Sequence, residues 1–381
     1  MRRWTVIVPG CLAAPDDESV LGQNLPGLAR LAEIGEVGGV LPVPLVETPE
    51  ALLLGMGPGE GQLRQGPLTV SALGADPPQR STQFHVSVLS VCDGVVGAAE
   101  FLPSDEDARE IVRLAERLNT KSLTFIPGEK LDHGLVWEAL GDMETTSAAA
   151  AVGRAMRECL PEGDGERVLR RFIDDGVNLL SETEWNDRRE EEGMARLNLL
   201  WPWGQGVRMP VPNLALRRGS PCWVWSDSMR MAGLARLCGY RHAVLGGLGH
   251  GLNLNVRGLC AELGSRDCAL AVIDGFSDWR AAGQVDEAAW MMKELDGALI
   301  SPLLELAREG SAHVSLILTG ALGGVCGTCF LGARGGGSAP LDERALEEPR
   351  LERKTIWERV EESLVEAGIA EERSAGAGPG V

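Results

Sequence analysis

The chain has 381 residues, of which 44% are hydrophobic, and a formal net charge of −19. This length and apolar content are sufficient for a sizeable buried core, and the length alone favours two domains. So negative a chain repels a phosphate backbone, and no basic stripe offsets the charge, so nucleic acid is excluded as a partner.

The first segment of the chain is interpreted as a core strand. Residues 4–8 (WTVIV) are apolar, and although Arg2 and Arg3 precede them as in an export signal, Pro9 breaks the apolar run too early. No run of 18 apolar residues follows, so the sequence predicts no membrane span. The nine cysteines are scattered rather than arranged as a disulfide framework, which indicates a reducing cytoplasm.

An α/β pattern occupies residues 1–91, which are predicted to form the first part of a core domain. Hydrophobic periodicity and turn residues predict these elements in chain order: a helix over 25–34, a strand over 37–43, a helix over 48–55 and a strand over 84–91.

A smaller α+β domain is predicted to be inserted over residues 92–200. Ser104 caps a strongly amphipathic helix over 105–118. The remaining predicted elements of the insertion are strands over 123–126 and 134–140, and helices over 148–159, 167–181 and 185–197.

The core domain is predicted to resume over residues 201–340, followed by a C-terminal helix and disordered tail over 341–381. The elements expected are strands over 223–225, 242–245, 269–273 and 314–318, and helices over 230–238, 256–263, from 285 to 296, and 349–367. The apolar run 269–273 is typical of a parallel strand covered on both faces. The predicted fold class is therefore α/β, with a mostly parallel sheet, helices on both faces and an inserted α+β domain.

The loop after the strand 269–273 is the best candidate for chemistry, because ligands bind at the carboxyl ends of strands in such sheets. It carries Asp274, Ser277 and Asp278. Two carboxylates favour a hard cation such as Mg²⁺ but hold it poorly alone, so a solvated loop is the alternative.

Two other motifs are weaker indications of a functional site. The glycine-rich stretch 246–251 (GGLGHG) fits neither the dinucleotide nor the P-loop spacing, which favours a tight turn over a phosphate site. Cys326 and Cys329 form a lone CxxC without further zinc ligands nearby. Incidental thiols, a redox pair and a zinc site remain open for these two cysteines.

Several segments resemble the archaeal-type 2,3-bisphosphoglycerate-independent phosphoglycerate mutases, an isomerase family of the alkaline phosphatase superfamily. The most specific is LLWPWGQG at 199–206, which is similar to the family's IWLWGQG. The others, within a resemblance spanning about residues 4–324, are LPGLARLAEIG at 25–35, LLLGMGP at 52–58, RQGPLTVSALG at 64–74, PGEKLDHGLVW at 127–137, NDRREEEG at 186–193, GLARLCGY at 233–240 and the stretch 267–296.

The resemblance implies two divalent metals (Mn, Mg or Zn) that activate a serine to take up a phosphoryl group, while arginines hold a phosphorylated acid. In this chain the nucleophile falls on Val46 and the Asp after it on Glu47. The other positions assigned to metal ligands fall on Pro9 of the Pro9–Gly10 pair, Ser277, Ala281, Gly320 and Ala321, and three arginine positions fall on Gln65, His85 and Asp132. Asn186, Arg189 and Gln205 match the family and are candidates for ligand binding.

The sequence therefore favours a catalytically degenerate relative, a glycolysis-related pseudoenzyme of the cytoplasm with no cofactor expected. It would bind a phosphorylated small acid or a protein partner. The alternative is an active mutase, or another phosphomonoester-processing enzyme, whose weak metal candidates are Glu47, Asp274 and Asp278.

Overall fold

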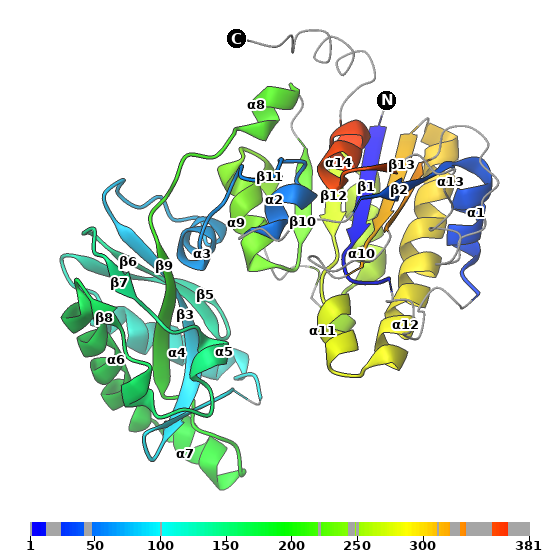
Figure 1. Ribbon diagram of the computed structural model, residues 1–381. Helices are drawn as coiled ribbons and strands as arrows, with labels where there is room; N and C mark the ends of the chain where they lie inside the picture. The colour runs from blue at the N-terminus through cyan, green and yellow to red at the C-terminus, as the bar shows by residue number, and fades with distance from the viewer. Residues whose placement is uncertain are drawn as a thin grey trace, which may run out of the picture. The chain divides into compact units, whose positions relative to one another are not determined.

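The computed structural model describes residues 2–12, 24–41, 48–99, 101–219, 222–242, 248, 251–310, 312–320, 328–332 and 353–364. The chain divides into two compact units. Met1–Gln62 and Val211–Val381 form the core unit, and Leu63–Pro210 form the inserted unit (Figure 1). Within the described ranges, no helix combines the length and apolar character needed to cross a membrane.

The core unit is built on an eight-stranded sheet in the order β11-β10-β12-β1-β13-β14-β2-β15. β10 pairs in parallel with β11 and β12, β1 with β12 and β13, and β15 with β2, whereas β14 is antiparallel to both neighbours. The strands are β1 (Arg2–Val8), β2 (Glu36–Val40), β10 (Trp223–Ser226), β11 (Arg241–His242), β12 (Cys268–Val272), β13 (Ala312–Leu318), β14 (Thr328–Gly332) and β15 (Arg353–Lys354).

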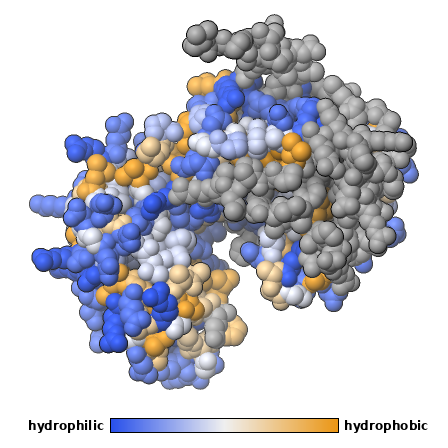
Figure 2. Space-filling model, in the orientation of Figure 1, coloured by the Kyte–Doolittle hydropathy of each residue, from blue (hydrophilic) through white to orange (hydrophobic). Residues whose placement is uncertain are grey.

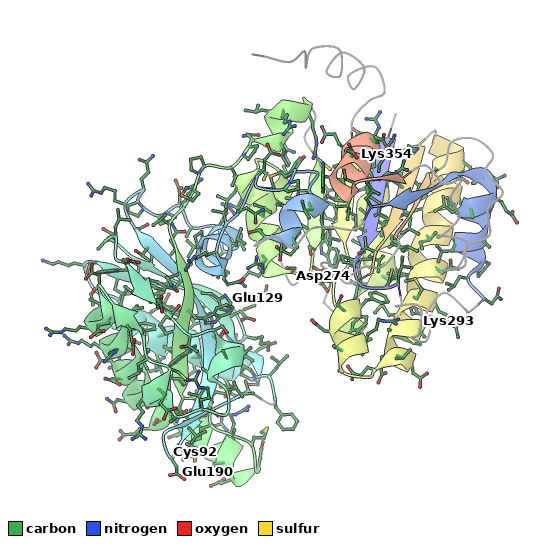
Figure 3. All side chains as sticks on the ribbon, viewed as in Figure 1. Cys92, Glu129, Glu190, Asp274, Lys293 and Lys354 are labelled. Atoms are coloured by element: carbon green, nitrogen blue, oxygen red, sulfur yellow. The ribbon has the colours of Figure 1, made fainter. Side chains whose placement is uncertain are left out.

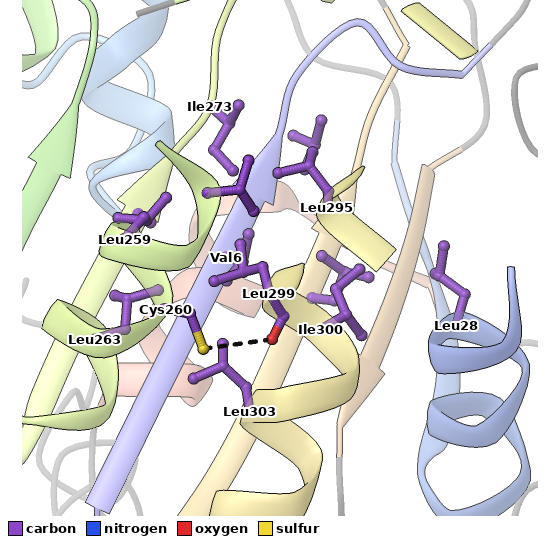
Figure 4. Close-up of a cluster of buried hydrophobic side chains, with 14 of the residues drawn as sticks. Val6, Leu28, Leu259, Cys260, Leu263, Ile273, Leu295, Leu299, Ile300 and Leu303 are labelled. Carbon is purple, nitrogen blue, oxygen red and sulfur yellow. Dashed lines mark hydrogen bonds between the residues drawn. The ribbon is translucent and has the colours of Figure 1, made fainter. Parts of the chain in front are cut away.

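Helices cover both faces of this sheet, as the apolar strands require. Trp4, Val6 and Val8 of β1 belong to a core cluster with leucines of α1, α10, α12 and α13 (Figure 4). Thr5, between them, donates a hydrogen bond to Ser363 of α14. The helices are α1 (Pro26–Ile34), α2 (Pro49–Leu53), α8 (Leu214–Arg218), α9 (Met229–Leu237), α10 (Val256–Gly264), α11 (Phe276–Ala281), α12 (Val285–Leu295), α13 (Ser301–Gly310), α14 (Ile356–Leu364) and the short 3₁₀ turn η3 (Gly251–Asn253).

A π-helical turn, η4 (Asp296–Ile300), joins α12 to α13. Its first residue, Asp296, is buried, and its carboxylate accepts backbone N–H groups of Gly27 at 2.9 Å and Leu28 at 2.6 Å. Those N–H groups lie in the first turn of α1, where a helix favours negative charge. Asp296 therefore fixes α1 to the long helical segment.

The C-terminal helix differs from the predicted surface helix over 349–367. The described helix α14 begins at Ile356, and Ile356, Val360 and Leu364 on its inner side are buried. Glu361 is ion-paired with the buried Arg218 at 2.5 Å. The apolar residues of α14 therefore pack against the sheet. The acidic residues of the same helix are what led the sequence to predict a surface helix.

The inserted unit contains the sheet β4-β3-β6-β5, with β9 paired to β3, and a separate β7-β8 pair. Phe84 and Val86 of β3 belong to a buried cluster with Ile111 of α4 and Phe172 of α6. The elements are β3 (Thr82–Cys92), β4 (Val95–Gly97), β5 (Leu123–Glu129), β6 (Asp132–Trp137), β7 (Met143–Glu144), β8 (Glu162–Gly163), β9 (Leu199–Gly206), α3 (Gln65–Ala72), α4 (Asp105–Ala115), η1 (Glu116–Leu118), α5 (Ala148–Ala151), η2 (Met156–Glu158), α6 (Glu166–Ser181) and α7 (Glu184–Glu191).

The inserted unit is wider than the predicted insertion over 92–200. β3 and β9, which the sequence analysis assigned to the core domain, pair antiparallel with each other, with Leu89 opposite Leu199. A period-two pattern identifies a strand but not its partner, and this pairing carries both strands and α3 into the inserted unit. The face of this unit that Figure 2 shows mixes hydrophilic and hydrophobic residues. Phe101 and Leu102 are among the exposed hydrophobic residues of the unit.

Candidate functional site

The carboxyl ends of four neighbouring parallel strands meet at one edge of the core sheet, where such folds bind ligands. The loops that follow are Pro9–Leu12 after β1, Ser226–Ser228 at the end of β10, Asp274–Ser277 after β12 and Thr319–Gly320 after β13. The predicted acidic loop is therefore at the edge of the sheet that the sequence analysis expected.

Asp274 is joined to a residue that the sequence analysis did not single out, Asp227. Asp227 Oδ1 accepts the Asp274 backbone N–H at 3.2 Å, and its Oδ2 accepts that of Gly251 at 3.3 Å. The signal for Asp227 was its place directly after the buried strand β10, the same relation that marked Asp274 after β12. Asp227 thus joins its own loop to the loop of Asp274 and to that of Gly251 through hydrogen bonds.

The electrostatic surroundings of Asp274 favour its protonated form. Burial and the nearby carboxylates of Asp227, Glu50 and Asp278 together raise the pKa of Asp274 to about 7, while a hydrogen bond with Ser226 opposes the shift. Glu50 is paired with Arg230 at 2.6 Å. Asp274, labelled in Figure 3, is therefore a half-buried carboxyl group that exchanges its proton near neutral pH.

At the same edge of the sheet, Gly10 contacts both Ser277 and Gly320, three residues at or next to positions where the resemblance implies metal ligands. The Ser277 Oγ fills the space that a Cβ on Gly10 would need, and the Ser277 backbone nitrogen would be 2.8 Å from that Cβ. The Gly10 N–H donates to the Gly320 carbonyl at 3.1 Å. Gly10 has a φ of +72°, which favours glycine, and it is buried.

These residues do not fit a pair of divalent metals. Pro9, Gly10 and Gly320 offer no side-chain oxygen, and Ser277 is packed into the glycine backbone rather than into open space. In the part of the chain that the structure describes, no three Asp, Glu, His or Cys side chains are grouped so that they could hold a metal ion. Val46, Glu47, Ala321 and Cys326 lie outside the described residues, as does most of the stretch 246–251, and only the backbone of Cys329, in β14, is described.

In the inserted unit, the three positions where the resemblance implies arginines are linked by hydrogen bonds. Gln65 Nε2 donates to Thr69 Oγ1 at 3.2 Å, Thr69 Oγ1 is 2.9 Å from His85 Nδ1, and His85 Nε2 is 3.0 Å from Asp132 Oδ1. Thr69 and His85 are buried, whereas the Asp132 side chain is 55% exposed. We call these four residues the Gln65–Asp132 chain.

The Gln65–Asp132 chain satisfies its own buried polar groups. Both ring nitrogens of His85 have partners inside the chain, and the exposed end is a carboxylate. A cluster of arginines would present positive charge and several N–H donors to a phosphate. The present arrangement has no arginine, and its exposed charged group is the Asp132 carboxylate, which repels an anion.

The candidates for ligand binding are also engaged within the inserted unit. The Asn186 side chain donates to the carbonyls of Leu180 and Leu197 and accepts the Leu197 N–H at 2.8 Å. Arg189 donates to the carbonyls of Ala195 and Phe101, and its side chain is almost fully buried. These contacts show that both residues hold loops in place.

Gln205, the third candidate, has its side chain bound to the neighbouring β7 segment. Its Nε2 donates to the Met143 carbonyl at 2.7 Å, and its Oε1 accepts from the Thr145 hydroxyl. The Gly204 N–H donates to the same hydroxyl oxygen at 3.1 Å. These bonds explain the sequence WGQG, because the glutamine joins β9 to β7. Ligand binding by Asn186, Arg189 and Gln205 stays a prediction.

The mostly parallel sheet, the helices on both of its faces and the inserted α+β unit define an α/β protein of the alkaline-phosphatase-like fold. No family model matches the chain. The chain is 25% identical over 311 residues to the 2,3-bisphosphoglycerate-independent phosphoglycerate mutase of Methanothrix thermoacetophila, covering 77% of each chain. It is 27% identical over 303 residues to the protein of the same name from Methanoculleus marisnigri, covering 74% of each.

Solved structures show the same fold. The PH0037 protein of Pyrococcus horikoshii matches with a TM-score of 0.70 at 16% identity, over 100% of this chain and 99% of that one. The cofactor-independent phosphoglycerate mutase of Thermoplasma acidophilum matches with a TM-score of 0.61 at 18% identity, over 95% and 98% of the two chains. The chain is therefore phosphoglycerate-mutase-like in sequence and in fold.

Proposed function

We propose that this chain is a catalytically degenerate phosphoglycerate-mutase-like protein, which keeps the fold of its relatives and binds a partner instead of transferring a phosphoryl group. The observation that carries the proposal is the contact of Gly10 with Ser277 and Gly320 at the carboxyl edge of the core sheet. Three loops that would each present a metal ligand meet there through small residues and backbone groups.

The inserted unit supports the proposal independently. A phosphorylated acid needs N–H donors and positive charge, and the Gln65–Asp132 chain presents an exposed carboxylate instead. Of the two partners that the sequence leaves open, a phosphorylated small acid and a protein, these residues favour a protein. We place this binding role in the cytoplasm and, by the names of the relatives, close to glycolysis.

The test is a single-turnover assay with 3-phosphoglycerate and added Mn²⁺, Mg²⁺ or Zn²⁺, run beside the Methanothrix thermoacetophila relative. We expect no 2-phosphoglycerate above the metal-only background and no phosphorylated side chain in the intact mass of the protein. A phosphorylated enzyme, or turnover that tracks the added metal, would overturn the proposal. Phosphoryl transfer that the Asp278→Ala variant lacks would instead establish the rearranged acidic site.

A further inference from the structure

Two cysteines lie side by side at the amino edge of the core sheet, where β10 and β12 begin. β10 and β12 are parallel neighbours with Trp223 opposite Ala269, so the residues directly before them, Cys222 and Cys268, are opposite each other. Paired residues of neighbouring strands point to the same face. The Cys222 thiol donates to the Trp223 carbonyl at 3.6 Å, and each of the two thiols shifts the pKa of the other. The Asp274 loop follows the other end of the same strand β12.

The surroundings of the two thiols differ. The neighbouring Cys222 thiol lowers the pKa of the Cys268 thiol, and Arg3 and Arg218 lower it further, against burial and the carboxylate of Asp267. The Cys268 thiol and burial raise the pKa of Cys222. Cys268 is 8% exposed and Cys222 is 2% exposed. Both thiols are buried, and of the two Cys268 is the one that ionises more readily, which favours it as the attacking thiol.

The strand geometry allows a covalent bond between the two sulfur atoms. Neighbouring strands lie about 4.7–4.9 Å apart, and a disulfide joins Cα atoms that are about 4.4–6.8 Å apart. A disulfide between Cys222 and Cys268 therefore fits the existing strand spacing without a large backbone movement.

We propose that Cys222 and Cys268 form a redox pair that a small hydroperoxide converts to a disulfide. The Cys268 thiolate attacks the peroxide, the O–O bond breaks, and Cys268 becomes a sulfenic acid as hydroxide or alkoxide leaves. The Cys222 sulfur then attacks the Cys268 sulfur, forming the S–S bond and releasing water that takes up the Cys222 proton. Two thiols and one hydroperoxide give one disulfide, one water and one further water or alcohol.

The test uses the full chain, treated with hydrogen peroxide, alkylated and digested with trypsin. Cleavage after arginine places Cys222 in the peptide 219–230 and Cys268 in the peptide 267–280, and each peptide contains a single cysteine. We expect a species containing both peptides that has lost the mass of two hydrogen atoms and separates on reduction. Two separately alkylated peptides after peroxide treatment would overturn the proposal.

Variants test the roles of the two thiols. In Cys222→Ser the sulfenic acid on Cys268 has no resolving thiol, so dimedone labelling of the peptide 267–280 should rise. In Cys268→Ser, oxidation of Cys222 should be about tenfold slower than in the wild type. The double variant Cys326→Ser/Cys329→Ser should keep the cross-link, and Cys260→Ser is the control for a buried cysteine outside the pair. Dimedone on Cys222 instead of Cys268 would contradict the assignment of the attacking thiol, and the wild-type digest tests the pair even if a variant fails to fold.

Discussion

The two units of the chain differ in how they fill the positions where the resemblance implies the working residues of a phosphoglycerate mutase. In the core unit, positions assigned to metal ligands hold small residues, and the loops have closed on each other through Gly10, Ser277 and Gly320. In the inserted unit, positions assigned to arginines hold polar residues that bond to one another from Gln65 to Asp132. The comparison teaches that such positions can be occupied by backbone packing in one unit and by a polar network in the other.

Mutations should affect the stability of the packed loops and of the hydrogen-bonded network differently. Gly10 tolerates no side chain, because the added group would meet the backbone nitrogen of Ser277, which cannot move cheaply, as well as the Ser277 side chain. A hydrogen-bonded network tolerates changes at its exposed end and not in its buried middle. We therefore expect the effects of mutation to decrease from the packed glycine, through the buried groups, to the exposed carboxylates.

The largest effect is expected for Gly10→Ala. The added methyl group would overlap Ser277 Oγ and would force a side chain into a backbone with a φ of +72°. We expect a loss of about 3–5 kcal/mol in the free energy of unfolding of the core unit, measured by urea denaturation.

The matched control is Gly59→Ala. Gly59 has a φ of +93° but no atom within 4 Å of the position that an added methyl group would take, so it reports backbone strain without a clash. Its cost should be about 1 kcal/mol. Equal costs at the two positions would show that the loops around Gly10 are not packed together, and the comparison between the units would fail.

The second effect is a pH-dependent gain in stability for Asp274→Asn. Because the pKa of Asp274 is raised to about 7 from 3.8, the folded state keeps a proton that the unfolded state releases between these values. Stability therefore falls as pH rises from about 4 to about 7 and then stays constant. The variant should equal the wild type near pH 4 and exceed it above pH 7 by an amount on the order of 2–4 kcal/mol. A difference independent of pH in thermal melts would argue against a protonated Asp274.

A smaller effect is expected in the middle of the Gln65–Asp132 chain. His85→Ala removes the partner of Thr69 and leaves a buried hydroxyl with fewer bonds, at a cost of about 1–3 kcal/mol to the inserted unit. Asp132→Asn, at the exposed end, should cost less than about 1 kcal/mol. The readout is hydrogen exchange of β3 and β6 amides. A larger loss at Asp132 than at His85 would mean that the network is organised around the carboxylate.

The smallest effect is expected for Asp278→Ala. Asp278 is exposed in α11, so its removal should change stability by less than about 0.5 kcal/mol. The protein should retain no metal before or after the change, and partner binding should stay unchanged. Loss of a bound metal in this variant would restore the rearranged acidic site as an explanation of function.

The sequence predicted the fold more completely than it predicted the contacts. Apolar runs such as 269–273 and the spacing of α4 identified strands and helices, because burial imposes those patterns locally. The pairing of β3 with β9 joins residues more than a hundred positions apart, and no local pattern encodes it. The same limit explains why the predicted insertion began too late along the chain.

In the candidate site, too, residues marked by a local pattern were predictable and contacts between distant segments were not. Asp274 and Asp278 were recognisable because they follow a buried strand, and Asp227 obeys that rule after β10 without having been identified. Thr69 was beyond prediction, because its role depends on His85 lying across from α3. The pairing of Cys222 with Cys268 likewise depends on the order of strands in the sheet.

The metal content of the purified protein tests the central claim most directly. The full chain would be loaded with Mn²⁺, Mg²⁺ or Zn²⁺, desalted and analysed for bound metal, with the Methanothrix thermoacetophila relative treated in parallel. A degenerate site predicts that this chain retains no stoichiometric metal under conditions in which the relative does. Two metals per chain would contradict the account and would mean that other residues rebuild the centre.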